Sequence, residues 1–249
     1  ADLLAYRADI YPTPPMNWND LASGPRPFTF AANDPGAVFT LAQYMAAGGV
    51  VEDESGAALL QSEPLQAVLA FYQDLRDTGV LPLSSTQLTS TGESWAAVRD
   101  GRAASGAAPL RGVLAAEDSK RFGVAPLPGQ QEPGLVLLHP WVWAIAATEP
   151  EQQKSAADLV EWLLDPAFLG TWTEALGIVP ATPDALQAWT DVDDAATVAS
   201  LLSTARLMPG DAILARVAPA LLQATLDVIT GAQSPEDAAA EAEASLASP

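Results

Sequence analysis

The chain has 249 residues, of which 49% are hydrophobic and 17% charged, a composition that excludes an intrinsically disordered protein and provides for one large domain or two modest ones. With 31 acidic and 11 basic residues its formal net charge is −20, so it repels phosphate backbones, and nucleic acid is excluded as an expected partner. It has no cysteine, which excludes disulfides and cysteine-ligated zinc, and no apolar run approaches the roughly 20 residues that span a bilayer.

The first half of the chain predicts short strands interleaved with helices. Prolines at positions 12, 14 and 15 exclude a helix there, and Asn17 is a suitable cap for a short helix that starts at Trp18. Glycines that follow apolar periodic segments mark helix ends. In chain order, we expect a strand over 3–6, a helix from 18, a strand over 27–31, helices over 37–47, 62–79 and around 95–98, and a strand over 122–129.

The second half begins with the most strand-like stretch and then turns helical. Residues 135–146 alternate so that Trp141, Trp143 and Ile145 share one face of a strand. The sequence 148–151 is typical of a capping box and predicts a helix that reaches about residue 164. Further helices are expected over 166–176, 183–190, 193–206, 212–230 and 235–247.

Most catalytic chemistry lacks the residues it needs. His139 is the only histidine, so a site with several histidine ligands is excluded, and no Gly-x-Ser-x-Gly elbow accompanies it for a catalytic triad. Neither a dinucleotide-binding glycine motif nor a phosphate-binding loop is present. With 31 acidic residues, an acid/base enzyme that uses paired carboxylates stays open as an alternative.

A series of short motifs occurs in a characteristic order along the chain. Each motif alone is only a turn or a helix end. Together they resemble the extracellular solute-binding family of sugar ABC importers, the maltose-binding-protein-like receptors. The motifs are Leu4–Asp9, Pro14–Leu21, Ala46–Gly49, Asp53–Gly56, the helix over 62–79, Ser94–Ala104, Phe122–Gly129, Ala144–Ala146, Gly177–Ala181 and Thr230–Ala238.

The resemblance implies an α/β, periplasmic-binding-protein-like (type II) fold, with two lobes that close around a ligand. The match begins just after the first crossing between the lobes, so we expect roughly 100 residues of the N-terminal lobe to be missing. The chain would then hold mostly the helix-rich C-terminal lobe. Residues 1–133 and 166–249 are assigned to that lobe, and 134–165 to the N-terminal lobe and hinge.

The resemblance also implies where ligand contacts lie. Asp34 matches a carboxylate in a family loop, and Arg111 follows Leu110, which stands where a sugar-stacking tryptophan is expected. His139, Trp141 and Trp172 are the other candidate ligand contacts.

Each candidate has a structural alternative. Asp34 precedes a proline, which favours capping of a helix start over a ligand contact. Core burial suits Trp141 and Trp143 at least as well as a ligand contact, and a histidine such as His139 is more often structural. Trp95 and Trp162 are expected to be core residues. Gly36, Leu110 and Ala218 stand where the family has aromatic side chains, which weighs against a maltose-like sugar without excluding other sugars.

The sequence therefore predicts a solute-binding protein of an ABC transporter that captures a carbohydrate, without catalysis, metal or cofactor. Its partners would be a small-molecule sugar and an ABC permease, and its location extracytoplasmic, either periplasmic or lipid-anchored. The N-terminus shows no signal peptide, which fits a mature, a trimmed or a cytoplasmic chain. Two alternatives stay open: a secreted carboxylate-based carbohydrate-active enzyme, and an interaction module on the same fold.

Overall fold

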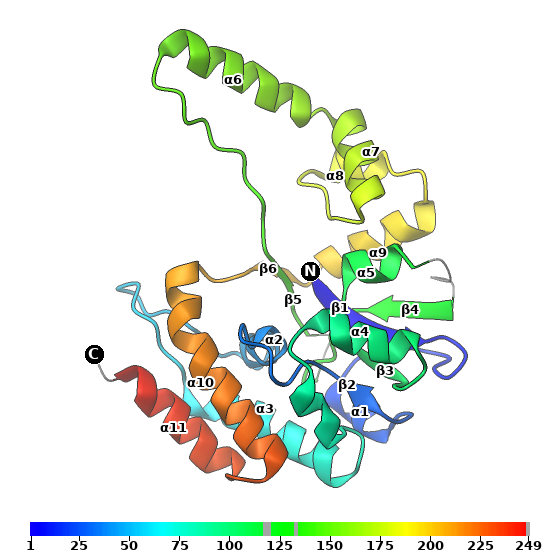
Figure 1. Cartoon of the computed structure of the whole chain (residues 1–249), viewed down its shortest axis with the longest axis vertical. Helices are drawn as coiled ribbons and strands as arrows, with labels where there is room; N and C mark the ends of the chain where they lie inside the picture. The colour runs from blue at the N-terminus through cyan, green and yellow to red at the C-terminus, as the bar shows by residue number, and fades with distance from the viewer. Residues whose placement is uncertain (117–120, 132–133, 248–249) are drawn as a thin grey trace. The chain divides into compact units, whose positions relative to one another are not determined.

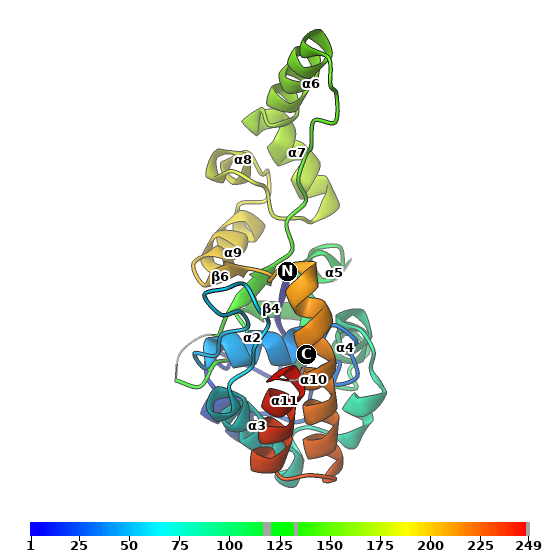
Figure 2. The same cartoon turned by 90° about the vertical axis from the view of Figure 1, so that its left-hand side faces the viewer.

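A computed structural model describes residues 1–116, 121–131 and 134–247 of the chain (Figure 1, Figure 2). The chain divides into two compact units. Unit 1 comprises Ala1–Leu138 and Thr204–Pro249, and unit 2 comprises His139–Ser203.

The centre of unit 1 is a four-stranded sheet with the order β2-β3-β1-β4. β1 runs antiparallel to both of its neighbours, β3 and β4, whereas β2 and β3 are parallel. A separate pair, β5 and β6, is parallel, and it joins the segments on either side of unit 2. The strands are β1 (Asp2–Arg7), β2 (Phe28–Thr29), β3 (Ser105–Pro109), β4 (Phe122–Ala125), β5 (Val136–Leu138) and β6 (Ala205–Leu207).

Helices from both ends of the sequence pack together in unit 1. The long α3 contacts α10 and α11 from the C-terminus, and α10 also contacts α2. The elements are α1 (Trp18–Ser23), α2 (Val38–Ala46), α3 (Ser62–Asp77), the 3-10 helix η1 (Leu83–Gln87), α4 (Thr91–Arg99), α5 (Leu110–Leu114), α10 (Asp211–Thr230) and α11 (Pro235–Ala247).

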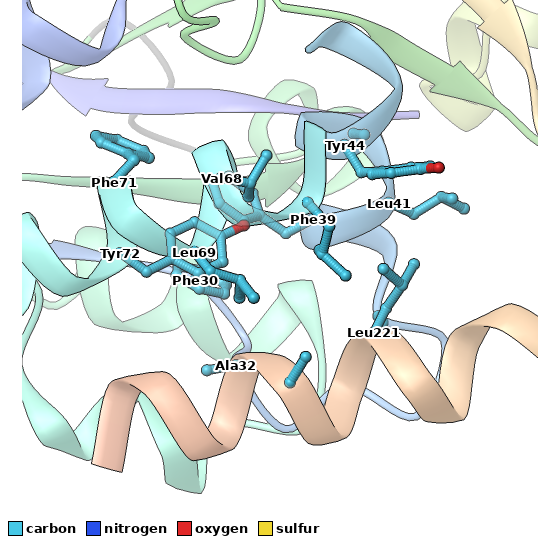
Figure 3. Close-up of a cluster of buried hydrophobic side chains, with 14 of the residues drawn as sticks. Phe30, Ala32, Phe39, Leu41, Tyr44, Val68, Leu69, Phe71, Tyr72 and Leu221 are labelled. Carbon is cyan, nitrogen blue, oxygen red and sulfur yellow. The ribbon is translucent and has the colours of Figure 1, made fainter. Parts of the chain in front are cut away.

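The core of unit 1 is built around a group of aromatic rings (Figure 3). Phe30 stacks on Phe39 of α2 with 4.2 Å between ring centroids, and Phe30 and Tyr72 of α3 lie 5.1 Å apart. Leu221 of α10 belongs to the same cluster and is fully buried. Residues separated by most of the chain therefore form a single apolar core, which positions the sheet and its connecting loops.

Helix α10 is the one helix of the described residues that is long and apolar enough to cross a membrane, with a mean hydropathy of 1.5. Its buried side includes Val217, Leu221 and Val228 in the core of unit 1. The hydroxyl groups of Thr225 on α10 and Thr40 on α2 also lie within hydrogen-bond distance, at 2.8 Å. Packing inside unit 1 therefore accounts for the apolar composition of this helix.

Unit 2 contains α6 (Pro150–Leu163), α7 (Pro166–Leu176), α8 (Pro183–Gln187) and α9 (Val192–Leu202). Its small core lies between α7 and α8, where Gly170 faces the backbone carbonyl of Ala185 so closely that a side chain would clash. Trp189 is buried there, and its indole N–H donates to the Thr173 hydroxyl at 3.2 Å. The helix α6 contributes no buried residue.

Most helices and several caps were predicted correctly. The helices over 166–176 and 235–247 have the expected bounds, and Asn17 accepts the backbone N–H of Asp20 as the expected cap. Thr182 and Ser234 also accept backbone N–H groups at the starts of α8 and α11.

Three local predictions were wrong. The strand over 135–146 ends at Leu138, because the residues beyond it find no neighbouring strand in the described chain. No side-chain cap forms at the start of α6, where the sequence 148–151 predicts a capping box. The predicted helix 193–206 stops at Leu202, since Ala205–Leu207 pairs with β5.

Candidate functional site

Strand direction gathers polar residues at one end of the sheet in unit 1. The parallel strands β2 and β3 end there, and β1, which is antiparallel to β3, begins there with Asp2 opposite Pro109. Asp34 lies in the loop that leads from β2 to α2, and Arg111 lies at the start of α5, directly after β3. Loops at the carboxyl ends of strands are where ligands bind in open α/β sheets. We call Asp2, Asp34, Thr91 and Arg111 the strand-end group.

Asp2 is the member of this group that sequence reasoning missed. Its carboxylate accepts a hydrogen bond from the Thr91 hydroxyl at 2.9 Å, which brings the first turn of α4 to the same end of the sheet. Burial raises the pKa of the Asp2 carboxyl above 3.8, and nearby Asp34 adds to the increase. The Thr91 hydrogen bond and the amino terminus act in the opposite direction. The only signal in the sequence was an acidic residue at the start of an apolar strand.

Asp34 is partly buried and fulfils the capping role that was its structural alternative. Its carboxylate oxygens accept the backbone N–H groups of Gly36 and Val38, both at 3.1 Å, and so hold the first turn of α2. Each carboxylate oxygen has two lone pairs, so this role leaves acceptor capacity on Asp34. Neither Asp2 nor Asp34 forms an ion pair with any described residue.

Arg111 is exposed on α5, and its guanidinium forms no ion pair within the part of the chain that the structure describes. Leu110 before it is 3% exposed and packs in the core, so it offers no side-chain face at this position. The strand-end group therefore presents carboxylates, a hydroxyl and a guanidinium. It can accept hydrogen bonds from hydroxyl groups and donate hydrogen bonds to oxygen atoms.

The other three candidates lie in unit 2. His139 and Trp141 are exposed in the segment that follows β5, and the exposed fraction of the Trp141 side chain is 98%. Trp172 lies on α7 and is 41% exposed. Of the predicted site residues, Asp34 and Arg111 lie at the same end of the sheet in unit 1. His139 and Trp141 are near each other only because they are two residues apart in the sequence.

The tryptophans predicted as core residues behave differently from one another. Trp95 is buried and packs edge-on against Phe122 with 4.8 Å between ring centroids, as expected. Trp162, in contrast, is 57% exposed, because α6 packs against too little of the described chain to cover it. Its ring lies 4.4 Å from that of Phe168 on α7. Burial of Trp162 was therefore a wrong prediction.

Acidic residues do not assemble into a metal site within the described ranges of the chain, in which no group of three or more His, Cys, Asp or Glu side chains is placed to hold an ion. The carboxylate of Glu174 instead accepts hydrogen bonds from the backbone of Thr190 and Asp191, both at 2.8 Å, so it fixes a loop.

A family comparison identifies what the chain is similar to. The model of the family described as bacterial extracellular solute-binding protein matches residues 2–200. No curated protein matches the chain significantly.

Solved structures share the fold at low sequence identity. The cyclic α-maltosyl-1,6-maltose binding protein of Arthrobacter globiformis matches with a TM-score of 0.77 and 18% identity, over 98% of this chain and 68% of its own. Maltose-bound MalE3 of T. maritima matches with a TM-score of 0.72 and 20% identity, over 99% of this chain and 70% of its own. The maltose/maltodextrin-binding domain MalE of Bdellovibrio bacteriovorus, bound to maltotriose, matches with a TM-score of 0.69 and 19% identity. This match covers 99% of this chain and 69% of that structure. These matches confirm the predicted periplasmic-binding-protein-like fold class.

Proposed function

The chain belongs to the bacterial extracellular solute-binding proteins, and from this premise we propose that it captures a carbohydrate for import through an ABC permease. The strand-end group in unit 1 is the observation that carries the proposal. Its side chains come from separate parts of the sequence, and strand pairing brings them to one end of a sheet.

The chemistry of the strand-end group suits a neutral polyhydroxyl ligand. Sugar hydroxyl groups donate to the carboxylates of Asp2 and Asp34, and the guanidinium of Arg111 donates to hydroxyl or ring oxygens. Thr91 holds Asp2 in place through its hydroxyl. A ligand that both donates and accepts hydrogen bonds therefore complements these four residues.

Unit 2 supplies the predicted contacts with apolar character. Trp141 and Trp172 expose indole surface that suits stacking on the face of a pyranose ring. His139 adds a polar group that both donates and accepts. These three residues stay predicted ligand contacts, as do Asp34 and Arg111.

The proposal names carbohydrates as a class and no particular sugar. Gly36 and Leu110 stand where maltose-binding relatives are expected to have aromatic side chains, and Leu110 is buried. The solved relatives that bind maltose or maltotriose are 19–20% identical to this chain and so support the fold alone. We therefore expect a sugar whose stacking surface differs from that of maltose.

A receptor of this class acts outside the cytoplasm, either in the periplasm or anchored by lipid, and it performs no catalysis, because it releases its ligand unchanged. Ligand shifts the population toward a closed, permease-competent state only if it binds that state more tightly. We also propose that residues 1–133 and 166–249 belong to the C-terminal lobe and 134–165 to the N-terminal lobe and hinge.

A thermal-shift screen of the protein as its native cell makes it tests this function. The panel contains maltose, maltotriose, trehalose, xylobiose and cellobiose. A ligand at about 100 times its Kd stabilises the native state by about 2.7 kcal/mol, which raises the Tm of a chain of this size by several degrees. At least one sugar is expected to give such a shift. A chain that responds to none of these sugars, yet turns over a glycoside, would favour the carboxylate-based enzyme instead.

Matched substitutions separate the strand-end group from general electrostatic effects. Arg111→Ala and Asp34→Asn are expected to weaken sugar binding about tenfold or more, since each removes a charged hydrogen-bonding group. Arg102→Ala removes another exposed arginine. Asp53→Asn changes a carboxylate in the 52–58 loop that also accepts backbone N–H groups. Both controls are expected to leave sugar affinity unchanged.

A further inference from the structure

Helix α4 is hydrogen-bonded to the strands on both sides of β3. The Thr91 hydroxyl donates to the carboxylate of Asp2 in β1 at 2.9 Å. The Ser94 hydroxyl, three positions further along α4, donates to the backbone carbonyl of Thr29 in β2 at 3.1 Å. Residues three apart lie on the same face of a helix, so both hydroxyl groups face the sheet. Because β3 lies between β2 and β1, these two hydrogen bonds fix the position of α4 across it.

A glycine in β3 leaves room for the second of these hydrogen bonds. Gly106 lies opposite Thr29 in the parallel register of β2 and β3. A Cβ atom at this glycine would lie 2.7 Å from the carbonyl oxygen of Thr29 and 2.9 Å from the hydroxyl oxygen of Ser94. Side chains in proteins do not approach so closely, so a larger residue there would displace α4. Ser94 therefore reaches β2 because β3 has no side chain at that point.

Thr29 also contacts the segment that leads to Asp34. Its side-chain hydroxyl lies 3.1 Å from the hydroxyl of Ser85 in η1, within hydrogen-bond distance. The backbone carbonyl of Ser85 accepts the N–H of Ala32 at 3.1 Å, two residues before Asp34. One threonine is thus connected through its carbonyl to α4, which holds one carboxylate of the strand-end group, and through its hydroxyl to the loop that carries the other.

The three side-chain hydroxyl groups in this arrangement are buried. The exposed fraction is 4% for Thr29 and 0% for Ser85 and Ser94. Folding removes the hydrogen bonds that these groups make with water, so the protein must replace them. Displacement of α4 or η1 would leave a buried polar group without its partner, which is costly. Hydrogen bonds also depend on direction, so they fix a position more narrowly than apolar packing does.

We propose that Thr29, Ser85 and Ser94 are positioning residues of the binding site, which hold the two carboxylates of the strand-end group at a fixed separation. Because all three are buried, they act through the residues they hold and not by contact with the ligand. A site that is already held in its binding geometry loses less conformational freedom when the ligand binds, and this raises affinity. The inference rests on the proposed function, since it takes the strand-end group as the place where ligand binds.

Titration of Asp2 in the full chain tests the arrangement without any ligand. Burial raises the pKa of the Asp2 carboxyl and nearby Asp34 adds to the increase, whereas the Thr91 hydrogen bond and the amino terminus oppose it. Ser94→Ala frees the start of α4, so the hydrogen bond from Thr91 should weaken. Asp2 should then titrate at a higher pH than in wild type. The NMR chemical shift of the Asp2 carboxyl carbon, followed as a function of pH, measures this change.

Two further variants calibrate the titration. Thr91→Val removes the hydrogen bond itself and sets the largest upward change to be expected. Ser105→Ala is the matched control, because Ser105 in β3 is also 0% exposed and its hydroxyl lies 3.3 Å from that of Tyr11. It should leave the Asp2 titration unchanged. No change in Ser94→Ala or in Thr91→Val, or equal changes in Ser94→Ala and Ser105→Ala, would overturn the inference.

Sugar affinity shows whether this positioning matters for binding. The probes are the five sugars of the thermal-shift panel, and the Kd is measured for each sugar that shifts the Tm. Thr29→Val keeps the shape of the side chain but removes its hydroxyl, so affinity should fall about tenfold. Thr29→Ser keeps the hydroxyl and should bind within about twofold of wild type. Equal affinities of these two variants would contradict the inference. If none of the sugars shifts the Tm, the proposed function fails, and the Asp2 titration still supports or overturns the arrangement of the hydroxyl groups.

Discussion

The carboxylate of Asp2 accepts a 2.9 Å hydrogen bond from the hydroxyl of Thr91, which ties the first residue of β1 to the first residue of α4. These positions are 89 residues apart, and the contact places a partly buried charge at the end of the sheet where Asp34 also lies. It is the feature of the strand-end group that depends most on the three-dimensional fold.

We expect Asp2→Asn to raise the Tm at neutral pH. Burial raises the folded-state pKa of Asp2 above 3.8, so the folded protein prefers the protonated form, and stability falls as the pH rises through that range. Asparagine keeps the acceptor for Thr91 and removes the charge. The Tm difference from wild type should vanish near about pH 3, where both side chains are neutral. Thermal melts between about pH 3 and about pH 7 measure this.

Asp9→Asn is a control for which we expect the opposite change in Tm. The hydrogen bond from Arg7, at 2.6 Å, lowers the pKa of the exposed Asp9 carboxyl, so its contribution is present at neutral pH and is lost as the pH falls through the lowered pKa. A small decrease in Tm at neutral pH is expected for this variant. If Asp2→Asn also lowered the Tm there, the burial of Asp2 would not be the dominant effect.

Thr225→Val should destabilise unit 1 by about 1–3 kcal/mol, because it leaves the buried Thr40 hydroxyl without one of its partners. Thr230→Val on the same helix is the control, since the Thr230 hydroxyl is exposed and bonds only to backbone carbonyls of its own helix. Urea denaturation of both variants gives the two free energies of unfolding. Equal values would show that the contact between α2 and α10 contributes little.

Gly49→Ala and Gly92→Ala should change stability in opposite directions. A side chain at Gly49 would collide with the ring of Tyr44, whose hydroxyl donates to Val50 and accepts from the Gln61 backbone. A loss of about 1–3 kcal/mol is expected there. Gly92 lies in the first turn of α4 with space around it, so alanine should stabilise by up to about 1 kcal/mol. Denaturant midpoints of the two variants and of wild type measure both changes in stability.

Glu174→Gln should loosen the start of α9. The carboxylate of Glu174 accepts the backbone N–H groups of Asp191 and Thr190, and these hydrogen bonds lower its pKa below 4.5. Its contribution is therefore present above that pH and is lost as the pH falls through the lowered pKa. Limited proteolysis between α8 and α9 should be faster in this variant than in wild type. Glu161→Gln, an exposed change on α6, should leave the cleavage rate unaltered.

Most helices and several of their caps were predictable because their signals are local. The cap at Asn17 and the ends of α7 depend on residues within one turn of each other. Strands depended on distant partners. β3 consists of small residues with no strand-like pattern and exists because β1 and β2 pair with it, whereas the stretch after Leu138 has the pattern but no partner in the described chain.

The candidate site was predictable to the same extent. Asp34 and Arg111 follow strands, so their loops could be matched to family loops. Asp2 and Thr91 were missed because their contact depends on the register of β1 against β3, which local sequence does not encode. Exposure of Trp162 was missed since its apolar helix face predicts burial, and the described chain supplies nothing to bury it.

The parallel pairing of β5 with β6 has a consequence for how this protein can be shortened. Val136 lies opposite Ala205, and Leu138 opposite Leu207, so both strands point the same way. Parallel neighbours cannot be joined by a tight turn and need a crossover of a dozen or more residues. Replacing unit 2 with a short hairpin loop would therefore reverse one strand and break the pair. A form of unit 1 from which unit 2 has been removed therefore needs a linker of about a dozen residues or more between β5 and β6.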